Sequence, residues 1–175
     1  MGIAQQTQKP TALVCTSGSA LLNYYPAFAE AFYSQIPLIV ISADRPLDKI
    51  DIGDGQTIRQ SNVFENHSLY NANLSEEASV ENDFKINEAI NIAITKKGPV
   101  HINAPFEEPL YETILAPTYV PKVTSSAIED AEFTLNAKFI SEWQSAKKKL
   151  ILVGELLPNA IEQKHIESLA NDESV

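Results

Sequence analysis

Cationic side chains are scarce in this 175-residue chain, which has 13 lysines and arginines against 23 aspartates and glutamates. The resulting formal net charge of -10 repels other polyanions, so nucleic acid and anionic membrane surfaces are excluded as expected partners. Long hydrophobic runs are also absent, since the longest, Ile36 to Ile41, is too short to span a bilayer. Because the first ten residues lack the pattern of a secretory signal, the sequence predicts a soluble, cytoplasmic chain.

Cysteine is nearly absent, since Cys15 is the only one. A single thiol excludes an intrachain disulfide and a cysteine metal cluster. Cys15 lies in the apolar run ALVCT, which is typical of a buried strand thiol rather than of a nucleophile. The three histidines, His67, His101 and His165, share no ligand spacing, so the sequence predicts no metal site within the chain.

Apolar patterns predict an α/β fold. Strands are expected at 11–16 (TALVCT), 37–42 (PLIVIS) and 99–105 (PVHINAP). Between the first two, apolar residues from Leu21 to Phe32 recur at helical spacing. A second helix, with Asp83 as its N-cap and the glycine of KKG as its stop, is expected before the third strand. The strand, helix, strand order requires crossovers, so the strands should form a parallel sheet with flanking helices.

The chain is expected to contain parts of two domains. Residues 1–112 form the first, and a proline-containing linker at 113–132 leads to the start of a second α/β domain at 133–175. The second pattern comprises a helix capped by Thr134, a strand at LILVG and a helix opened by Pro158. About forty residues cannot bury a core unaided, so we expect the chain to be a fragment cut within its second domain.

Arginine is rare: the chain has two, Arg45 and Arg59, both in SADRPLDKIDIGDGQTIRQ directly after the second predicted strand. Guanidinium suits bidentate capture of a carboxylate, and ligands of parallel sheets bind at the carboxyl ends of strands. Because Arg45 precedes Pro46, its backbone should be extended and its side chain should project from the strand end. Gln56 can donate and accept beside either arginine.

Structural roles are the alternatives for both arginines. Arg45 can instead pair with a nearby aspartate, for which the candidates are Asp44, Asp48 and Asp51. Arg59, at the start of an expected short helix, can be solvated or structural.

Two glycine-containing turns are predicted. In TSGSA, residues 16–20, free backbone N–H groups and a helix N-terminus would converge on one spot, although an ordinary strand-to-helix turn gives the same pattern. The GDG triplet at 53–55 matches the opening of the signature by which thiamine diphosphate enzymes hold magnesium and diphosphate. The residues after it are polar and lack the rest of that signature, so we interpret GDG as a turn.

Four motifs in one order, TSGSA, SADRP, GQTIRQ and HINAPFEEPLY, resemble those of a single enzyme family. The chain is similar to the MenD family, the thiamine diphosphate-dependent 2-succinyl-5-enolpyruvyl-6-hydroxy-3-cyclohexene-1-carboxylate synthases of menaquinone biosynthesis. The resemblance covers nearly the whole chain. It implies the latter part of a pyrimidine-binding domain followed by the start of a central domain.

The resemblance implies a carboligase that decarboxylates 2-oxoglutarate on thiamine diphosphate, with Mg2+ as a second cofactor. The succinyl semialdehyde carbanion equivalent is then added to isochorismate. The activating glutamate, the diphosphate site and the metal site are implied to lie outside this chain, which alone should be inactive. Family active sites lie between subunits, which implies a homodimer or homotetramer of the parent.

The resemblance also implies roles for particular residues. Arg45 and Gln56 match family residues that hold the isochorismate-derived part of the substrate. The turn near the pyrimidine ring of the cofactor is matched by Ser17, Gly18 and Ser19. Gly55 stands where the family usually has asparagine, so any contact from that side chain is lost. Arg59 stands where the family often has arginine, and no substrate contact is assigned to it.

Two alternatives remain open. A non-catalytic α/β module that binds an anionic ligand or partner at the same strand ends would carry the same local pattern. Another thiamine diphosphate carboligase is the second alternative. An upstream acidic motif and a genuine downstream GDG motif in the encoding DNA would identify an enzyme.

Overall fold

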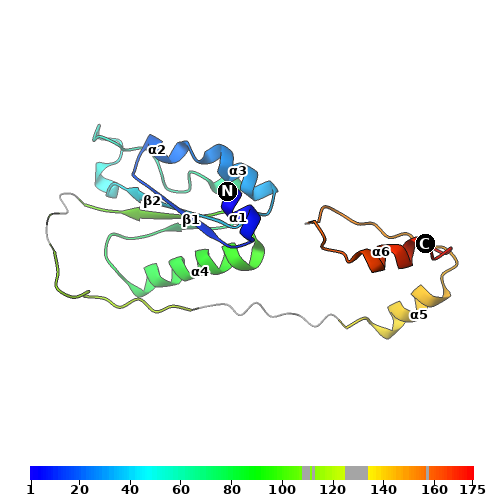
Figure 1. The fold of residues 1–175 in the computed structure, drawn as a ribbon. Helices are drawn as coiled ribbons and strands as arrows, with labels where there is room; N and C mark the ends of the chain where they lie inside the picture. The colour runs from blue at the N-terminus through cyan, green and yellow to red at the C-terminus, as the bar shows by residue number, and fades with distance from the viewer. Residues whose placement is uncertain (108–110, 112, 125–133, 157) are drawn as a thin grey trace. The chain divides into compact units, whose positions relative to one another are not determined.

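The computed structural model describes residues 1–107, 111, 113–124, 134–156 and 158–175 (Figure 1). The chain divides into two compact units, residues 1–128 and 129–175. The boundary falls within 125–133, outside the described residues, so the predicted linker at 113–132 is described only to residue 124. The predicted domain limits at 112 and 133 also lie outside the described residues and stay predictions.

A four-stranded parallel sheet organises the first unit, in the order β1-β2-β4-β3. The strands are β1 (Thr11–Cys15), β2 (Leu38–Asp44), β3 (Asn71–Asn73) and β4 (Val100–Pro105). The predicted parallel α/β sheet is therefore confirmed, with its three predicted strands side by side. The short edge strand β3 was missed, because two of its three residues are asparagines and it shows no apolar run.

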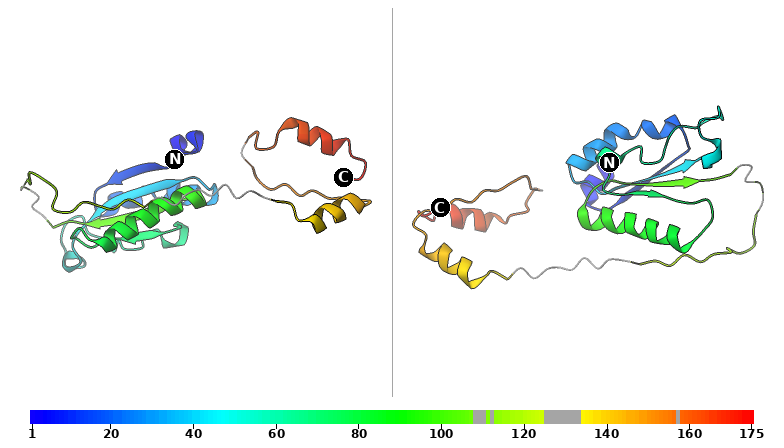
Figure 2. Two further views of the ribbon diagram at one scale, coloured as in Figure 1. Left: turned by 90° about the horizontal axis from the view of Figure 1, so that it is seen from below. Right: turned by 180° about the vertical axis from the view of Figure 1, so that it is seen from behind.

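Helices cover both faces of this sheet (Figures 1 and 2). One face carries α1 (Gly2–Thr7), α2 (Ser19–Leu22) and α3 (Tyr25–Tyr33), and the other carries α4 (Val80–Lys96). Side chains alternate along β2, so that Leu38 and Val40 pack with α3 while Ile39 packs with α4. Along β4, Val100 and Ile102 likewise face α4, which leaves His101 and Asn103 on the opposite side.

The helix predicted between the first two strands is split in two. α2 ends at Leu22 and α3 begins at Tyr25, with Pro26 in the first turn of α3. Proline lacks a backbone N–H and therefore fits a first turn better than a helix interior. The region between β2 and β3, predicted as polar and turn-rich, holds two short 3-10 helices, η1 (Leu47–Lys49) and η2 (Glu65–His67).

The predicted N-cap of α4 was wrong, whereas the helix ends within KKG as predicted. Ser79, not Asp83, is the N-cap, and its side chain accepts a hydrogen bond from the Asn82 backbone N–H at 3.2 Å. At the other end Lys97, not Gly98, has the left-handed conformation, with φ 48°. Gly98 instead lies close to the Leu69 side chain, which a Cβ at this position would displace.

Three polar side chains along α4 bind the extended segment 119–124. The Asp83 carboxylate accepts hydrogen bonds from the Tyr119 hydroxyl at 2.6 Å and from the Lys122 backbone N–H at 2.9 Å. One turn on, Asn87 donates to the Lys122 carbonyl and accepts from the Thr124 N–H, both at 2.8 Å. Asn91 donates to the Thr124 carbonyl at 3.0 Å. This Asp-Asn-Asn ladder holds residues 119–124 of the predicted linker against α4.

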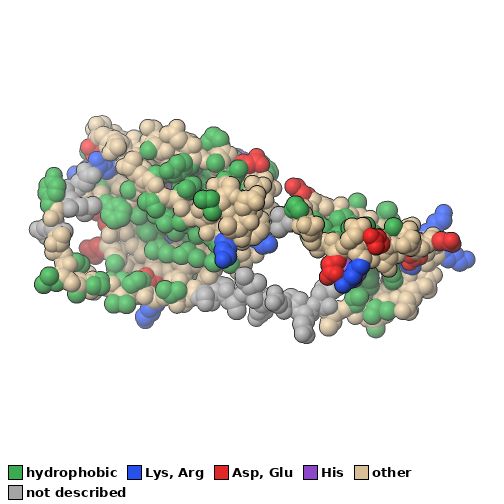
Figure 3. All heavy atoms as spheres, in the orientation of Figure 1, with side chains coloured by type: hydrophobic (Ala, Val, Ile, Leu, Met, Phe, Trp, Pro, Cys, Tyr) green, Lys and Arg blue, Asp and Glu red, His purple; other side chains and the backbone are tan. Residues whose placement is uncertain are grey.

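The edge strand β1 keeps one face uncovered. Cys15 and Leu13 are partly buried against the α2 and α3 core, and burial raises the pKa of the Cys15 thiol. Val14 points to the other side and is 72% exposed, because α4 contacts β2, β3 and β4. Hydrophobic side chains gather on the surface of this unit between α4 and the α2–α3 layer (Figure 3).

The second unit contains α5 (Ala137–Ser145) and α6 (Gln163–Ala170), and none of its described residues is buried. Asn136 caps α5 in place of the predicted Thr134, and α6 begins after Glu162 rather than at Pro158. The predicted strand at 150–154 is not formed, because among the described residues of this unit no neighbouring strand pairs with it.

The ladder on α4 makes a testable prediction about Asp83. Its pKa lies below the ordinary value of 3.8, first because Tyr119 donates to the carboxylate and then because the Lys122 N–H does. This stabilisation is complete above the ordinary pKa and is lost as pH falls through the lower folded-state pKa. We expect Tyr119→Phe to raise the Asp83 pKa, as measured by NMR titration of the carboxyl carbon. Tyr111→Phe, at an exposed tyrosine, is the control, and an Asp83 pKa that stays constant in Tyr119→Phe would contradict the ladder.

Candidate functional site

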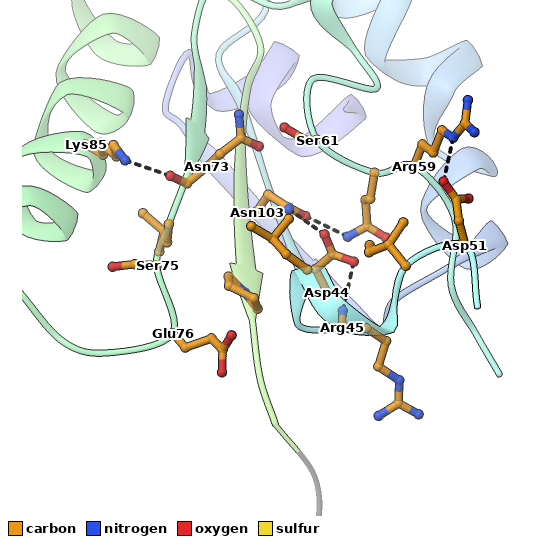
Figure 4. A pocket seen from close by; sticks show the side chains of 15 residues that line it. Asp44, Arg45, Asp51, Arg59, Ser61, Asn73, Ser75, Glu76, Lys85 and Asn103 are labelled. Carbon is orange, nitrogen blue, oxygen red and sulfur yellow. Dashed lines mark hydrogen bonds and ion pairs between the residues drawn. The ribbon is translucent and has the colours of Figure 1, made fainter. Parts of the chain in front are cut away.

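A pocket of about 690 Å3 opens at the carboxyl ends of β2, β3 and β4 (Figure 4). This is the edge at which parallel sheets bind ligands. Its wall carries cations, carboxylates and amides on an otherwise apolar surface, among them Asp44, Arg45, Asp51, Arg59, Gln60, Asn73, Lys85 and Asn103.

A buried carboxylate lies at the centre of this edge. Asp44, the last residue of β2, accepts hydrogen bonds from the Asn103 side-chain amide at 2.7 Å and from the Arg45 backbone N–H at 2.8 Å. β2 and β4 pair in parallel with Ser42 opposite Asn103, which places the two strand ends side by side. The carboxylate therefore fixes the backbone from which the Arg45 side chain departs.

Gln60 connects the carboxyl ends of β2 and β4 to the turn after β1. Its side chain is fully buried, and its Oε1 accepts the Gly18 backbone N–H at 3.0 Å. Its Nε2 donates to the Ala43 carbonyl at 2.6 Å and to Asn103 Oδ1 at 2.7 Å, with Ser42 Oγ at 3.0 Å. Each polar atom of the amide thus has a partner, as burial requires.

His101 lies beside this network and is held neutral. It is fully buried, and desolvation lowers its pKa from 6.5 to about 4. Ser42 Oγ donates to Asn103 Oδ1 and lies 2.7 Å from His101 Nε2, so we assign the imidazole proton to Nε2. The Nδ1 atom finds no hydrogen-bond partner among the described residues, and an unpaired acceptor is less unfavourable there than an unpaired N–H.

The two arginines occupy different surroundings, although both line the pocket. The Arg45 side chain is 16% exposed, and its Nε lies 3.4 Å from the Gly55 carbonyl and 3.9 Å from Asp54. Arg59 is 84% exposed and pairs with Asp51 at 3.0 Å, and the expected helix around it is not formed. Figure 4 shows the Arg59 guanidinium directed to Asp51 and the Arg45 guanidinium directed away from Asp44. The structure therefore does not form one clamp from the pair.

The predicted cofactor turn contacts the predicted substrate residue Gln56 through its backbone. Gly18 has φ 80° and ψ -152°, a conformation that essentially only glycine adopts. A Cβ at this position would lie 2.8 Å from the Gln56 carbonyl oxygen. Ser17 is buried, whereas Ser19 and the Gln56 side chain are exposed. None of these four residues lines the pocket.

The GDG triplet forms turns, as predicted. Gly53 has φ 89°, and the Asp54 carboxylate accepts the Gly55 backbone N–H at 2.9 Å. Gly55, which stands in place of the family asparagine, supplies its carbonyl to Arg45. The triplet therefore has a structural role beside Arg45.

Sequence reasoning missed Gln60, Asn103 and Ser42, and treated Asp44 only as a possible arginine partner. Gln60 and Gly18 are 42 residues apart and Gln60 and Asn103 are 43 apart, so no local pattern connects them. The usable signal was the polar alternation in HINAP, where histidine and asparagine occupy one face of a buried strand.

A family model for the thiamine pyrophosphate enzyme, N-terminal TPP binding domain, matches residues 1–69. The matched segment includes the Ser17–Ser19 turn, Arg45 and Gln60. Residues 1–69 are therefore similar to the N-terminal domain of thiamine pyrophosphate enzymes. Thiamine pyrophosphate and thiamine diphosphate are one compound, so this agrees with the resemblance seen in the motifs.

Three relatives align with the whole chain, and each is named 2-succinyl-5-enolpyruvyl-6-hydroxy-3-cyclohexene-1-carboxylate synthase. Identity is 67% with the protein of Flavobacterium psychrophilum, 64% with that of Flavobacterium johnsoniae and 51% with that of Christiangramia forsetii. The chain covers 32%, 32% and 34% of these proteins. It thus spans about a third of the length of the curated relatives it matches.

The described residues contain neither a cluster of metal-binding side chains nor a membrane-spanning helix. No group of three or more histidine, cysteine, aspartate or glutamate side chains in them is arranged to hold a metal ion. No helix among them has both the length and the apolar character needed to cross a bilayer.

Gly18 allows a direct test of the turn. We expect Gly18→Ala to lower the free energy of unfolding by about 1 to 3 kcal/mol, because the backbone conformation is strained for alanine and the Gln56 carbonyl must move. Gly55→Ala is the matched control, since no atom lies within 4 Å of its added Cβ, and its effect should stay within about 0.5 kcal/mol. Urea unfolding measures both; equal effects would refute the close Gly18 packing.

His101 makes the stability depend on pH. Because its folded-state pKa of about 4 lies below 6.5, the unfolded state binds the proton first, and stability should fall as pH drops from 6.5 towards 4. At about 1.4 kcal/mol per pKa unit, the loss should be on the order of 3 kcal/mol. In His101→Gln this loss of stability at low pH should be absent when urea unfolding is measured between pH 4 and 7.5. His165→Gln, on exposed α6, should retain it; a wild-type slope in His101→Gln would be inconsistent with the buried neutral imidazole.

Proposed function

We propose that the chain forms part of a 2-succinyl-5-enolpyruvyl-6-hydroxy-3-cyclohexene-1-carboxylate synthase. The longer protein would decarboxylate 2-oxoglutarate and add the succinyl semialdehyde carbanion equivalent to isochorismate, in menaquinone biosynthesis. Alignment of the whole chain with three proteins of that name supports this assignment. The activity belongs to the longer protein, and the chain alone is expected to be inactive.

Arg45 is the residue proposed to bind a carboxylate of isochorismate. Asp44 and Asn103 fix its backbone at the end of β2, and its side chain lines the pocket. The distance from its Nε to Asp54 is long at 3.9 Å, and Asp54 is 40% exposed, so this particular pair is weak. A substrate carboxylate offers the guanidinium a shorter, charge-assisted bond.

Gln56 is proposed to hold the same part of the substrate from the neighbouring turn. Its side chain is exposed and its backbone has φ 57°. Because its carbonyl packs against Gly18, the residue is fixed to the turn assigned to the cofactor. The side chain can donate and accept at once, which suits a hydroxyl or carboxylate of the acceptor.

Ser19 is the member of the predicted cofactor turn that is proposed to contact the pyrimidine ring. Its side chain is exposed, whereas Ser17 is buried and the Gly18 N–H is bonded to Gln60. Gly18 would thus shape the turn, and Ser19 would supply its polar contact. When bound, thiamine diphosphate supplies the electron sink for the decarboxylation. We place the diphosphate, the Mg2+ and the activating glutamate in parts of the longer protein outside this chain.

The proposal extends to assembly and location. The longer protein is proposed to be a cytoplasmic homodimer or homotetramer whose site combines segments of two subunits.

The observation that carries the proposal is the position of Arg45 at the pocket edge of a chain that aligns throughout with named synthases. The test uses the full-length protein with 2-oxoglutarate, isochorismate, thiamine diphosphate and Mg2+. Carbon dioxide release and the succinylated product should both require isochorismate and the cofactor. A protein that consumes 2-oxoglutarate but forms no product from isochorismate would exclude this function.

Substitution of each arginine separates their roles. We expect Arg45→Ala in the full-length protein to raise the KM for isochorismate about 10- to 150-fold, because a charge-assisted bond contributes about 1.5 to 3 kcal/mol. Arg59→Ala is the matched control, since its exposed pair with Asp51 should leave the KM unchanged. Steady-state kinetics measure both, and an unchanged KM in Arg45→Ala would refute the assigned role.

A further inference from the structure

We propose that Gln60 is a positioning residue that sets the Ser17–Ser19 turn at a fixed distance from the Arg45 end of β2. Gln60 would touch neither substrate nor cofactor. The inference rests on the proposed function, because it concerns how the cofactor side and the acceptor side of that site are aligned.

The first observation is the set of segments that one amide connects. Oε1 accepts from Gly18 in the turn after β1, while Nε2 donates to the Ala43 carbonyl in β2 and to Asn103 in β4. These partners are 42, 17 and 43 residues away in sequence. Among the described residues, no other side-chain hydrogen bond connects the Gly18 turn to β2 or β4. Moving the amide would therefore release the turn from the strand ends.

The second observation is that the same loop touches Gly18 twice. The Gln56 carbonyl oxygen lies 2.8 Å from the position that a Gly18 Cβ would take, and the Gln60 side chain binds the Gly18 N–H. Residues 56–60 are thus fixed to the turn through one backbone contact and one hydrogen bond. The loop that carries the proposed acceptor residue Gln56 can shift only together with the proposed cofactor turn.

The third observation concerns Arg45. Gln60 donates to the carbonyl of Ala43, and Asn103, its other partner, donates to Asp44. Asp44 in turn accepts the Arg45 N–H. Two short paths therefore connect Gln60 to the backbone of Arg45, one along β2 and one through the Asn103 amide.

Carboxamide is the group that this position requires. It must accept one hydrogen bond and donate two in a fully buried site. Glutamate can accept from Gly18 but, when ionised, cannot donate to Ala43 or Asn103. Asparagine keeps both groups but is one methylene shorter, so it cannot reach all three segments at once.

The test compares Gln60→Glu, Gln60→Asn and the core variant Val40→Ala in the full-length protein. Val40 is buried in the middle of β2, so its truncation removes packing without changing the polar network. Thermal unfolding gives the stability of each variant. Well below the unfolding temperature, the Kd for thiamine diphosphate is measured by fluorescence titration or calorimetry. Steady-state kinetics at the same temperature give kcat and the KM for isochorismate.

We expect the Gln60 variants to raise both the Kd for thiamine diphosphate and the KM for isochorismate, and to lower kcat/KM on the order of 100-fold. Val40→Ala should lower the Tm and leave both constants unchanged. If a folded Gln60 variant matches Val40→Ala in all constants, the residue is merely structural and the inference is wrong.

The cofactor titration separates this inference from the proposed function. If the wild-type protein makes no product from isochorismate, the function fails, but the Kd for thiamine diphosphate still decides the role of Gln60. A Kd that rises in Gln60→Glu or Gln60→Asn and not in Val40→Ala supports positioning of the turn. A Kd that is the same in all folded variants overturns it. Gln60→Asn keeps the test decisive where Gln60→Glu does not fold.

Discussion

A buried carboxamide is tolerated only when its carbonyl oxygen and its amino group all find partners, because each polar atom left unpaired costs about 1 to 3 kcal/mol. Gln60 meets this condition by joining the turn after β1 to the ends of β2 and β4. The neighbouring groups are then constrained in turn. Asn103 can bind Asp44, Asp44 can hold the Arg45 backbone, and Ser42 can pair with a neutral His101.

The sheet makes this network possible through its register. Ser42 lies opposite Asn103, and Asp44 opposite Pro105, so polar side chains from two parallel strands leave the core at one level. On the other face, Ile39, Val100 and Ile102 pack against α4. Because successive side chains along β2 and β4 point to opposite faces of the sheet, one face is an apolar layer and the other carries the polar side chains of the site.

Much of the fold was predictable because its central strands are apolar runs. TALVCT, PLIVIS and PVHINAP need only hydrophobic content to be recognised, whereas β3 is identified by its pairing with β4 and not by its residues. Helix N-termini were predicted poorly. Ser79 and Asp83 are both residues that cap helices, and in the structure Ser79 caps α4 while Asp83 binds the 119–124 segment. The strand predicted at 150–154 failed because hydrophobic composition does not supply a neighbouring strand.

The site was predictable in part, where a local sequence feature marks a residue. Different roles for Arg45 and Arg59 were predicted from Pro46 and from the SADRP motif, and in the structure each arginine pairs with a different aspartate. Gln60 could not be found in the same way, because a glutamine in a polar loop looks like a surface residue. Its burial results from contacts with residues more than 40 positions away.

The ladder on α4 has a consequence for sequence drift. In the 119–124 segment, Asn87 and Asn91 bind main-chain atoms of Lys122 and Thr124, so these contacts do not depend on the side chains at positions 122 and 124. Almost any residue can occupy them, with proline excluded wherever the N–H is used. The path of residues 122–124 is therefore set by side chains of α4, and within the segment the ladder uses only the Tyr119 side chain.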